Sequence, residues 1–355
     1  MAKVPQILPI TSIGKAIDEA SELIDIERSG AITGLYCRWS QLNRAKAKYW
    51  RFGRVTALCG MSGSGKSSIL NMLEDDFTNP LFNPSFLRHK NTLGVEEGED
   101  KIVILAFKYE MSASDEILRN LSGKVKKSYS YLLSSEIDKS KSDMERRDVY
   151  NKVNDDEYTS YRTNLETLRT KPIVFIETAG NLDQLYNTCR AVQEQYKGRR
   201  MVVTIDHHLL SKKLSERDDL ELSSRTAHTA IQLKKDFRAN VIFLMQLNGE
   251  IEKPIRRDNP SLQYPVKTDI HCGNQVFWAC DDVMIFHRPE VLHISKYGSK
   301  PFPLSTDKLI HCAYIKGRFG KTGNIFFEQE FDKGGMIQIT PESKKWKQEF
   351  EGFSM

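Results

Sequence analysis

The chain lacks the features that mark membrane-spanning, secreted and zinc-binding proteins. It has no run of about 18 apolar residues, so a spanning helix is not expected. Residues 1–5 are not followed by the apolar core of a signal peptide. The six cysteines show no C-x-x-C spacing, which favours reduced thiols over disulfides or a zinc site. With no internal repeat or low-complexity tract either, we expect a cytoplasmic protein without a membrane partner.

What remains is the composition of an ordinary soluble globular protein. Of its 355 residues, 39% are apolar and 28% are charged, which is enough for the core of one large domain or of two ordinary ones. The formal charge of +5 permits binding to a polyanion without requiring it.

One stretch carries a strong chemical signal. Residues 60–67 match the phosphate-loop pattern G-x-x-x-x-G-K-[ST], between a strand-like run at 55–59 and a helix-like run at 68–73. Glycines let backbone N–H groups wrap phosphates, and the helix N-terminus adds partial positive charge. Lys66 would reach the terminal phosphates and Ser67 would ligate Mg²⁺. A chance Gly/Ser-rich turn is the weaker alternative. The predicted nucleotide-binding residues are Gly60, Met61, Ser62, Gly63, Ser64, Gly65, Lys66, Ser67 and Ser68.

Beyond this loop, strand-like runs alternate with longer polar, helical stretches, which predicts an α/β fold with a mainly parallel sheet flanked by helices. Residues 78–100 read as a loop excursion and residues 115–169 as largely helical. We divide the chain into an N-terminal helix segment (1–30), a core (31–340) and a polar tail (341–355). The predicted strands are Ile102–Phe107, Ile173–Ile176, Met201–Ile205, Val241–Met245, Val283–Phe286, His311–Ile315 and Ile325–Phe327.

The N-terminal segment predicts one amphipathic helix at Gly14–Glu27. Its apolar stripe must be covered by its own domain or by a neighbouring subunit, and the sequence does not separate the two.

Polar side chains at three strand ends could complete a hydrolytic site. Asp206 follows an apolar strand, as a metal-holding Walker-B aspartate does, although a helix cap is the ordinary role of such a residue. Glu110 could activate water or could be a capping or ion-paired surface residue. Gln246 could sense the γ-phosphate or be a satisfied polar residue. His207 and His208 do not indicate a metal site, because adjacent strand residues point apart and no third ligand is evident.

Four motifs stand in order along the chain: Glu110-Met111-Ser112-Ala113, Ile205-Asp206, Gln246-Leu247-Asn248 and the stretch Tyr314 to Gly323. In this order they resemble the motifs of the DnaB-type, superfamily 4 replicative helicases, and the resemblance runs from about Gly30 to Phe331. It implies a RecA-like P-loop NTPase core that uses ATP or another NTP with Mg²⁺. It further implies that Glu110 is the catalytic base, that Asp206 and Ser67 hold the metal, and that Gln246 is the γ-phosphate sensor.

The family's K-x-R pair matches Lys316 and Arg318, which the resemblance implies act in trans on the nucleotide of the neighbouring subunit. An arginine that acts in this way is called an arginine finger, and it is chemically reasonable because a fixed cation stabilises the charge on the transferred phosphoryl group. A solvated basic turn is the alternative for this pair.

The chain departs from the family where that family carries a D-L-R-E-S-G element in a DNA-contacting loop. Here Thr268-Asp269-Ile270-His271-Cys272-Gly273-Asn274 stands in its place, with His271 and Cys272 where the family has its charged pair. We therefore take Arg256, Arg257 and His271 as the candidate DNA contacts, with an exposed charge pair as the alternative for the two arginines. The helix at Gly14–Glu27 resembles the family's linker helix, and there is no room for its N-terminal domain, which suggests a minimal, phage-like form.

The resemblance implies an ATP-dependent helicase that forms a hexameric ring, translocates on single-stranded DNA and unwinds forked DNA in the cytoplasm of a bacterial host. Primase or a helicase loader would be its protein partners. The alternative is a RecA-like recombinase or regulatory DNA-binding ATPase that does not unwind. Strand displacement by a closed ring would support the helicase, whereas open filaments would support the recombinase or regulatory ATPase.

Overall fold

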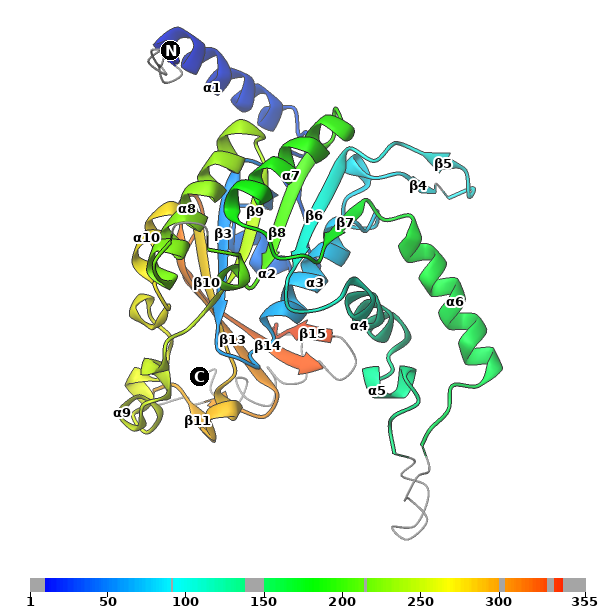
Figure 1. Ribbon diagram of the computed structural model, residues 1–355, viewed down its shortest axis with the longest axis vertical. Coiled ribbons are helices and arrows are strands. Elements are labelled where there is room, and N and C mark those ends of the chain that lie inside the picture. The colour runs from blue at the N-terminus through cyan, green and yellow to red at the C-terminus, as the bar shows by residue number, and fades with distance from the viewer. Residues whose placement is uncertain are drawn as a thin grey trace, which may run out of the picture.

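The computed structural model describes residues 10–90, 92–137, 150–213, 216–299, 304–330 and 335–340 (Figure 1). Their central feature is a nine-stranded sheet. In spatial order its strands are β15 (Gly335–Gln338), β14 (Gly323–Glu330), β13 (Leu309–Gly317), β10 (Asp282–His287), β3 (Arg54–Gly60), β9 (Asn240–Gln246), β8 (Arg200–Asp206), β6 (Ile102–Lys108) and β7 (Ile173–Ile176).

The strands from β10 to β7 run parallel, whereas β13, β14 and β15 add an antiparallel extension. The inner parallel strands are near-continuous apolar runs because helices cover both of their faces. The α/β prediction with a mainly parallel sheet is confirmed, and each predicted strand lies within an observed one.

Helices flank this sheet on both sides (Figure 1). They are α1 (Ile13–Arg28), α2 (Ser40–Ala45), α3 (Lys66–Phe77), α4 (Ala113–Val125), α5 (Tyr129–Leu132), α6 (Asp155–Arg169), α7 (Leu182–Gln195), α8 (Asp219–Asp236), α9 (Pro254–Arg257) and α10 (Gly273–Ala279). Among the described helices, none is long and apolar enough to cross a membrane.

Strand β3 lies between two apolar cores, because alternate side chains of a strand point to opposite faces. Val55, Ala57 and Cys59 belong to the core that contains residues of α7, α8 and α10. Leu58 belongs to the other core, with residues of α2 and α3. The end of β3, where the phosphate loop begins, is thus held from both sides.

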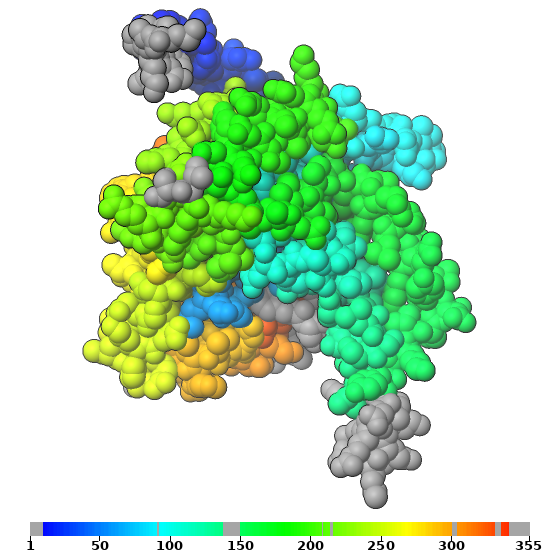
Figure 2. Space-filling model, viewed as in Figure 1, coloured from blue at the N-terminus to red at the C-terminus, as the bar shows by residue number. Residues whose placement is uncertain are grey.

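Helix α1 is the predicted N-terminal helix, and Figures 1 and 2 show it standing clear of the other elements. Ser12 caps it by accepting a hydrogen bond from the Lys15 N–H. None of its residues is buried. Its last turn is anchored by Glu27, whose carboxylate accepts hydrogen bonds from Tyr49 and Arg51, each at 2.7 Å.

The predicted loop at 78–100 contains a small hairpin, β4 (His89–Lys90) with β5 (Glu96–Glu97), and the 3-10 turn η1 (Pro84–Phe86). The helical prediction for 115–169 holds for α4, α5 and α6, while residues 138–149 and the tail at 341–355 lie outside the described part. The other short elements are β1 (Gly34–Leu35), β2 (Trp50–Arg51), β11 (Lys296–Tyr297), β12 (Leu304–Ser305), η2 (His208–Leu210), η3 (Gly249–Glu252), η4 (Pro260–Leu262), η5 (Lys267–Asp269) and η6 (Pro289–Leu292).

Candidate nucleotide-binding site

The phosphate loop connects the end of β3 to the start of α3, and its glycines are required by its shape. Gly63 and Gly65 adopt left-handed backbone angles, with φ of 72° and 87°. A Cβ on Gly60 would come within 2.4 Å of Ser64 Oγ and 2.7 Å of the Phe286 carbonyl oxygen. The loop therefore closes tightly enough to present the N-terminus of α3, whose N–H groups have no intrahelical acceptor, to an anion.

Lys66 is the first residue of α3, and its side chain reaches back to the phosphate loop. Its Nζ donates hydrogen bonds to the Met61 carbonyl at 2.6 Å and to Gln246 Oε1 at 3.3 Å. The second contact arises because β3 and β9 are neighbours with Gly60 paired to Gln246. Burial lowers the pKa of Lys66 to about 8 despite the opposing effect of Asp206. The positive charge of Lys66 is thus only partly compensated by neighbouring carboxylates, and a bound phosphate would stabilise it.

Ser67, in the first turn of α3, meets Asp206 at the end of β8, with Ser67 Oγ 3.3 Å from Asp206 Oδ1. Asp206 ends β8 and is 2% exposed. A hydroxyl and a carboxylate are the hard oxygen ligands that Mg²⁺ takes beside phosphate oxygens and water, so these two residues fit a magnesium ion. Elsewhere, the described residues include no group of three or more His, Cys, Asp or Glu side chains that could hold a metal.

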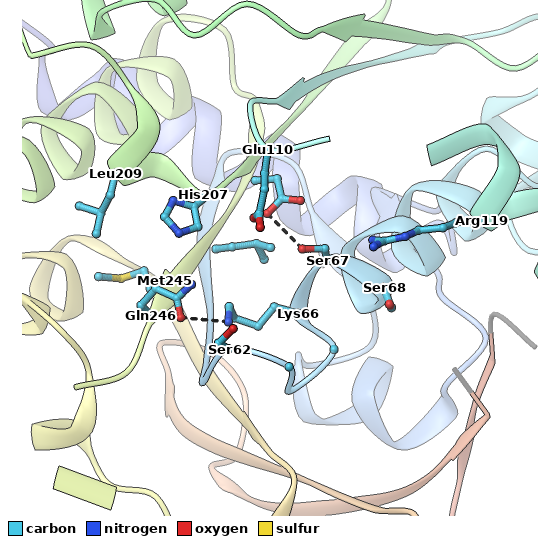
Figure 3. Close-up of a pocket in the computed structure, with 14 residues that line it drawn as sticks. Ser62, Lys66, Ser67, Ser68, Glu110, Arg119, His207, Leu209, Met245 and Gln246 are labelled. Atoms are coloured by element: carbon cyan, nitrogen blue, oxygen red, sulfur yellow. Dashed lines mark hydrogen bonds between the residues drawn. The ribbon is translucent and has the colours of Figure 1, made fainter. Parts of the chain in front are cut away.

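These side chains open into one cavity of about 220 Å³ (Figure 3). Glu110, which follows β6, lies on its wall with an exposed carboxylate that points inward. Because β6, β8, β3 and β9 run parallel, their carboxyl ends bring Glu110, Asp206, the phosphate loop and Gln246 to one edge of the sheet. Of the predicted loop residues, Ser62, Gly63, Gly65, Lys66, Ser67 and Ser68 line the cavity.

Two further polar residues line the cavity that sequence reasoning did not assign to it. Arg119 comes from α4, and its guanidinium points toward Ser67 (Figure 3). His207 directly follows Asp206 with a left-handed φ of 59°, and its ring lies on the cavity wall. The amphipathic pattern of α4 with Glu116 inward could have indicated Arg119, whereas nothing local signals the turn at His207.

Lys316 and Arg318 are not among the residues that line the cavity of their own chain. Lys316, near the end of β13, donates from Nζ to the carbonyl oxygens of Phe277 at 2.5 Å and Trp278 at 3.3 Å. The Arg318 side chain is 47% exposed, with Nε 3.3 Å from Asp281 Oδ1. Arg318 is therefore exposed, whereas the Lys316 ammonium is held against the end of α10.

The three candidate DNA contacts have different surroundings. Arg256 pairs with both carboxylate oxygens of Asp269, at 2.8 and 3.1 Å, so the alternative of an exposed charge pair is wrong for this residue. Arg257 pairs with Asp258 at 3.0 Å and is 42% exposed. His271 is half-buried, and its backbone N–H donates to the Gln246 carbonyl at 3.0 Å. This hydrogen bond ties the His271 segment directly to the strand that carries Gln246.

Comparison with known proteins places this geometry in context. Residues 34–333 match the family model described as the DnaB-like helicase C terminal domain. A solved structure described as an ATPase domain is similar, with a TM-score of 0.69 and 15% identity over 91% of this chain and 99% of that one. The structure titled "The Structure Of A DnaB-Like Replicative Helicase And Its Interactions With Primase" is also similar. Its TM-score is 0.67 and its sequence identity is 16%, over 94% of this chain and 68% of that one. None of the curated proteins compared with the chain matches it.

Proposed function

Because the chain belongs to the DnaB-like helicase C-terminal domain family, we propose that it is an ATP-dependent DNA helicase that translocates on single-stranded DNA and unwinds the duplex at a replication fork. The observation that carries the proposal is the convergence of Lys66, Ser67, Glu110, Asp206 and Gln246 on one cavity. A nucleotide-binding protein without hydrolysis would need only the phosphate loop.

Each residue has a role that its position supports. Lys66 binds the terminal phosphates, and Ser67 Oγ with Asp206 holds Mg²⁺, which supplies charge neutralisation at the phosphates when bound. Glu110 orients the attacking water and accepts its proton. Arg119 adds a second cation on the side of the cavity formed by α4. Gln246 exchanges its contact with Lys66 for one with the γ-phosphate, and the hydrogen bond from His271 passes the resulting shift to the DNA-contacting segment.

The site is completed by a second copy of the chain. Lys316 and Arg318 do not line their own cavity and Arg318 is exposed, which suits action on the nucleotide of a neighbour in a hexameric ring. Helix α1 supports the same assembly, because Ile13, Ile17 and Ile24 on it are 80%, 56% and 59% exposed. An anchored helix with an uncovered apolar stripe is stabilised when it docks on another subunit. Primase or a loader is a further candidate partner.

A fork-unwinding assay tests this proposal. The wild-type chain with Mg²⁺ and ATP should displace the strand of a forked duplex, and the reaction should stop without ATP or with Lys66→Ala. Arg169→Ala is the matched control for a lost cation, since Arg169 is exposed on α6 and pairs locally, with Glu166 at 2.8 Å. DNA-stimulated hydrolysis without strand displacement, on open filaments, would instead identify the recombinase-type or regulatory ATPase.

A further inference from the structure

An exposed aromatic platform lies beside the pair that acts in trans. Trp278, at the end of α10, is 68% exposed, and Phe277 packs edge-on against it with 5.9 Å between ring centroids. The Lys267 ammonium lies 4.6 Å from the Phe277 centroid and 4.8 Å from that of Trp278. Single exposed apolar residues are common, but this ring contacts Phe277 and the ammonium groups of Lys267 and Lys316. We call Lys267, Phe277, Trp278 and Lys316 the aromatic patch.

The aromatic patch is bonded to the same strand end that carries Arg318. Lys316 Nζ donates to the carbonyl oxygens of both Phe277 and Trp278, and its ammonium lies 5.0 Å from the Phe277 ring centroid. The Arg318 N–H donates to the carbonyl of Asp281, just beyond α10, at 2.9 Å. A displacement of α10 therefore displaces Lys316 and Arg318 with it.

We propose that Trp278 packs against a second copy of this chain at the rim of its nucleotide cavity, and that it is a positioning residue for Arg318. The inference rests on the proposed trans-acting role of Arg318. If Arg318 reaches the neighbour's phosphates, the bonds just described bring Trp278 to the edge of the same cavity.

The rim offers a matching surface. The turn η2 follows His207 and carries Leu209 on the cavity wall and Leu210, which is 42% exposed. An exposed indole and an exposed leucine on the two meeting faces would both be covered by contact. The exposed carboxylate of Glu110 on the cavity wall offers a partner of opposite charge for the Lys267 ammonium.

An aromatic ring flanked by lysines could also stack on a base of single-stranded DNA. The neighbour is favoured because both lysines already contact the rings and because the patch is bonded to the strand end that carries Arg318. The DNA platform is accordingly one outcome of the test.

The test compares Trp278→Ala, the conservative Trp278→Phe, and Leu81→Ala as a control at another exposed apolar residue, 86% exposed on the 78–100 segment. Nucleotide affinity, ATP turnover, oligomer size by sedimentation and single-stranded DNA affinity are measured for each full-length chain. Trp278→Ala should keep nucleotide affinity within about twofold, reduce turnover at least about tenfold and reduce assembly, with Trp278→Phe largely restoring both.

Leu210→Ala should reduce ATP turnover as Trp278→Ala does. The turnover defect of the double variant should be smaller than the two single defects combined, because the two side chains would form one contact. Subtracting the tryptophan fluorescence of Trp278→Phe from that of the wild type isolates the emission of Trp278. This emission should shift to shorter wavelength when the chains assemble, because contact with the neighbour buries the indole. Normal turnover and assembly with weakened DNA binding by Trp278→Ala would overturn the inference in favour of a DNA platform. If Trp278→Ala is normal in every assay while Arg318→Ala is inactive, the inference fails but the proposed function stands; a wild-type chain without ATPase activity refutes the proposed function itself.

Discussion

Arg318 is bonded to Asp281 twice, through its backbone N–H to the Asp281 carbonyl at 2.9 Å and through Nε to Oδ1 at 3.3 Å. Asp281 is 1% exposed and also binds Lys234 Nζ at 2.7 Å. Burial raises the pKa of this carboxyl, but the hydrogen bonds from Lys234 and the Val55 N–H outweigh it and hold the pKa below its usual value. The backbone of Arg318 is thus fixed to the core while its guanidinium stays on the surface.

A mixing experiment tests whether Arg318 acts in trans. Arg318→Ala and Glu110→Gln should each reduce ATP turnover by about 10³-fold, because one removes the cation and the other the base. Mixed subunits form some interfaces with an intact Glu110 facing an intact Arg318, so the mixture should regain activity that neither variant has alone. A mixture of the active control Arg169→Ala with Glu110→Gln shows how much activity remains when only one of the two chains is inactive, and it provides the reference. Activity of pure Arg318→Ala near the wild-type level would rule out the finger.

The pKa of Lys66 predicts how nucleotide affinity depends on pH. The pKa is lowered from 10.5 to about 8 by burial, and the ammonium form binds phosphate, so affinity should be flat below pH 8 and fall about tenfold per unit above it. Between about pH 8 and 10.5 the unfolded chain binds more protons than the folded one at this residue, so the contribution of Lys66 to the free energy of unfolding rises with pH. Lost affinity would therefore not reflect unfolding driven by Lys66.

Calorimetric titration of a nonhydrolysable triphosphate at pH 8.5, in two buffers of different ionisation enthalpy, measures this coupling. Proton uptake on binding is expected, because phosphates favour the charged lysine. Constant affinity up to pH 9.5 with no proton uptake would contradict the prediction.

The fold was largely predictable from the sequence, whereas part of the site was not. The inner strands are buried on both faces, which makes each a recognisable apolar run, as in β6 and β9. The phosphate loop is one contiguous stretch of sequence, so its pattern alone was sufficient to locate it. The role assigned to Glu110 came from the resemblance to a family, because a glutamate after a strand has many uses.

The residues that were missed depend on tertiary contacts. Arg119 reaches the cavity only because α4 packs beside α3, and His207 only because the chain turns with a positive φ after Asp206. The ion pair of Arg256 could not be identified, because its partner Asp269 lies across a folded loop. Hydrophobic periodicity carries no information about such polar pairs.

Arg119 supports a separate prediction about nucleotide binding. Arg119→Ala should weaken triphosphate affinity about tenfold or more, since a cation that lines a phosphate pocket makes charge-assisted hydrogen bonds of about 1.5–3 kcal/mol. Binding of a nucleoside without phosphates should be unaffected. Equilibrium titration with a fluorescent nucleotide measures both, with Arg169→Ala as the control. Equal loss for nucleoside and triphosphate would indicate a damaged pocket rather than a lost phosphate contact.

A buried polar network holds α3 against the strands behind the cavity. Lys108 on β6 is 1% exposed and pairs with Glu74 of α3 at 3.1 Å, while Nζ also donates to Asn71 at 2.7 Å. Asn71 in turn donates to Glu116 of α4, and Thr204 donates to Glu74 at 2.5 Å. Burial alone would lower the pKa of Lys108, but the carboxylates of Glu74 and Glu116 outweigh it and raise that pKa. The lysine therefore stays charged and compensates the buried acids.

Removing that charge should destabilise the protein more than removing the whole pair. Lys108→Met leaves Glu74 buried without its cation and should lower the free energy of unfolding by about 3–5 kcal/mol. Lys108→Met combined with Glu74→Gln removes both charges and keeps an acceptor for Thr204, so we expect at least half of the loss to be recovered. Urea unfolding followed by circular dichroism measures each variant, with Lys235→Met, at an exposed residue of α8, as the control. If the double variant is no more stable than Lys108→Met alone, the uncompensated charge of Glu74 is not the reason for the loss.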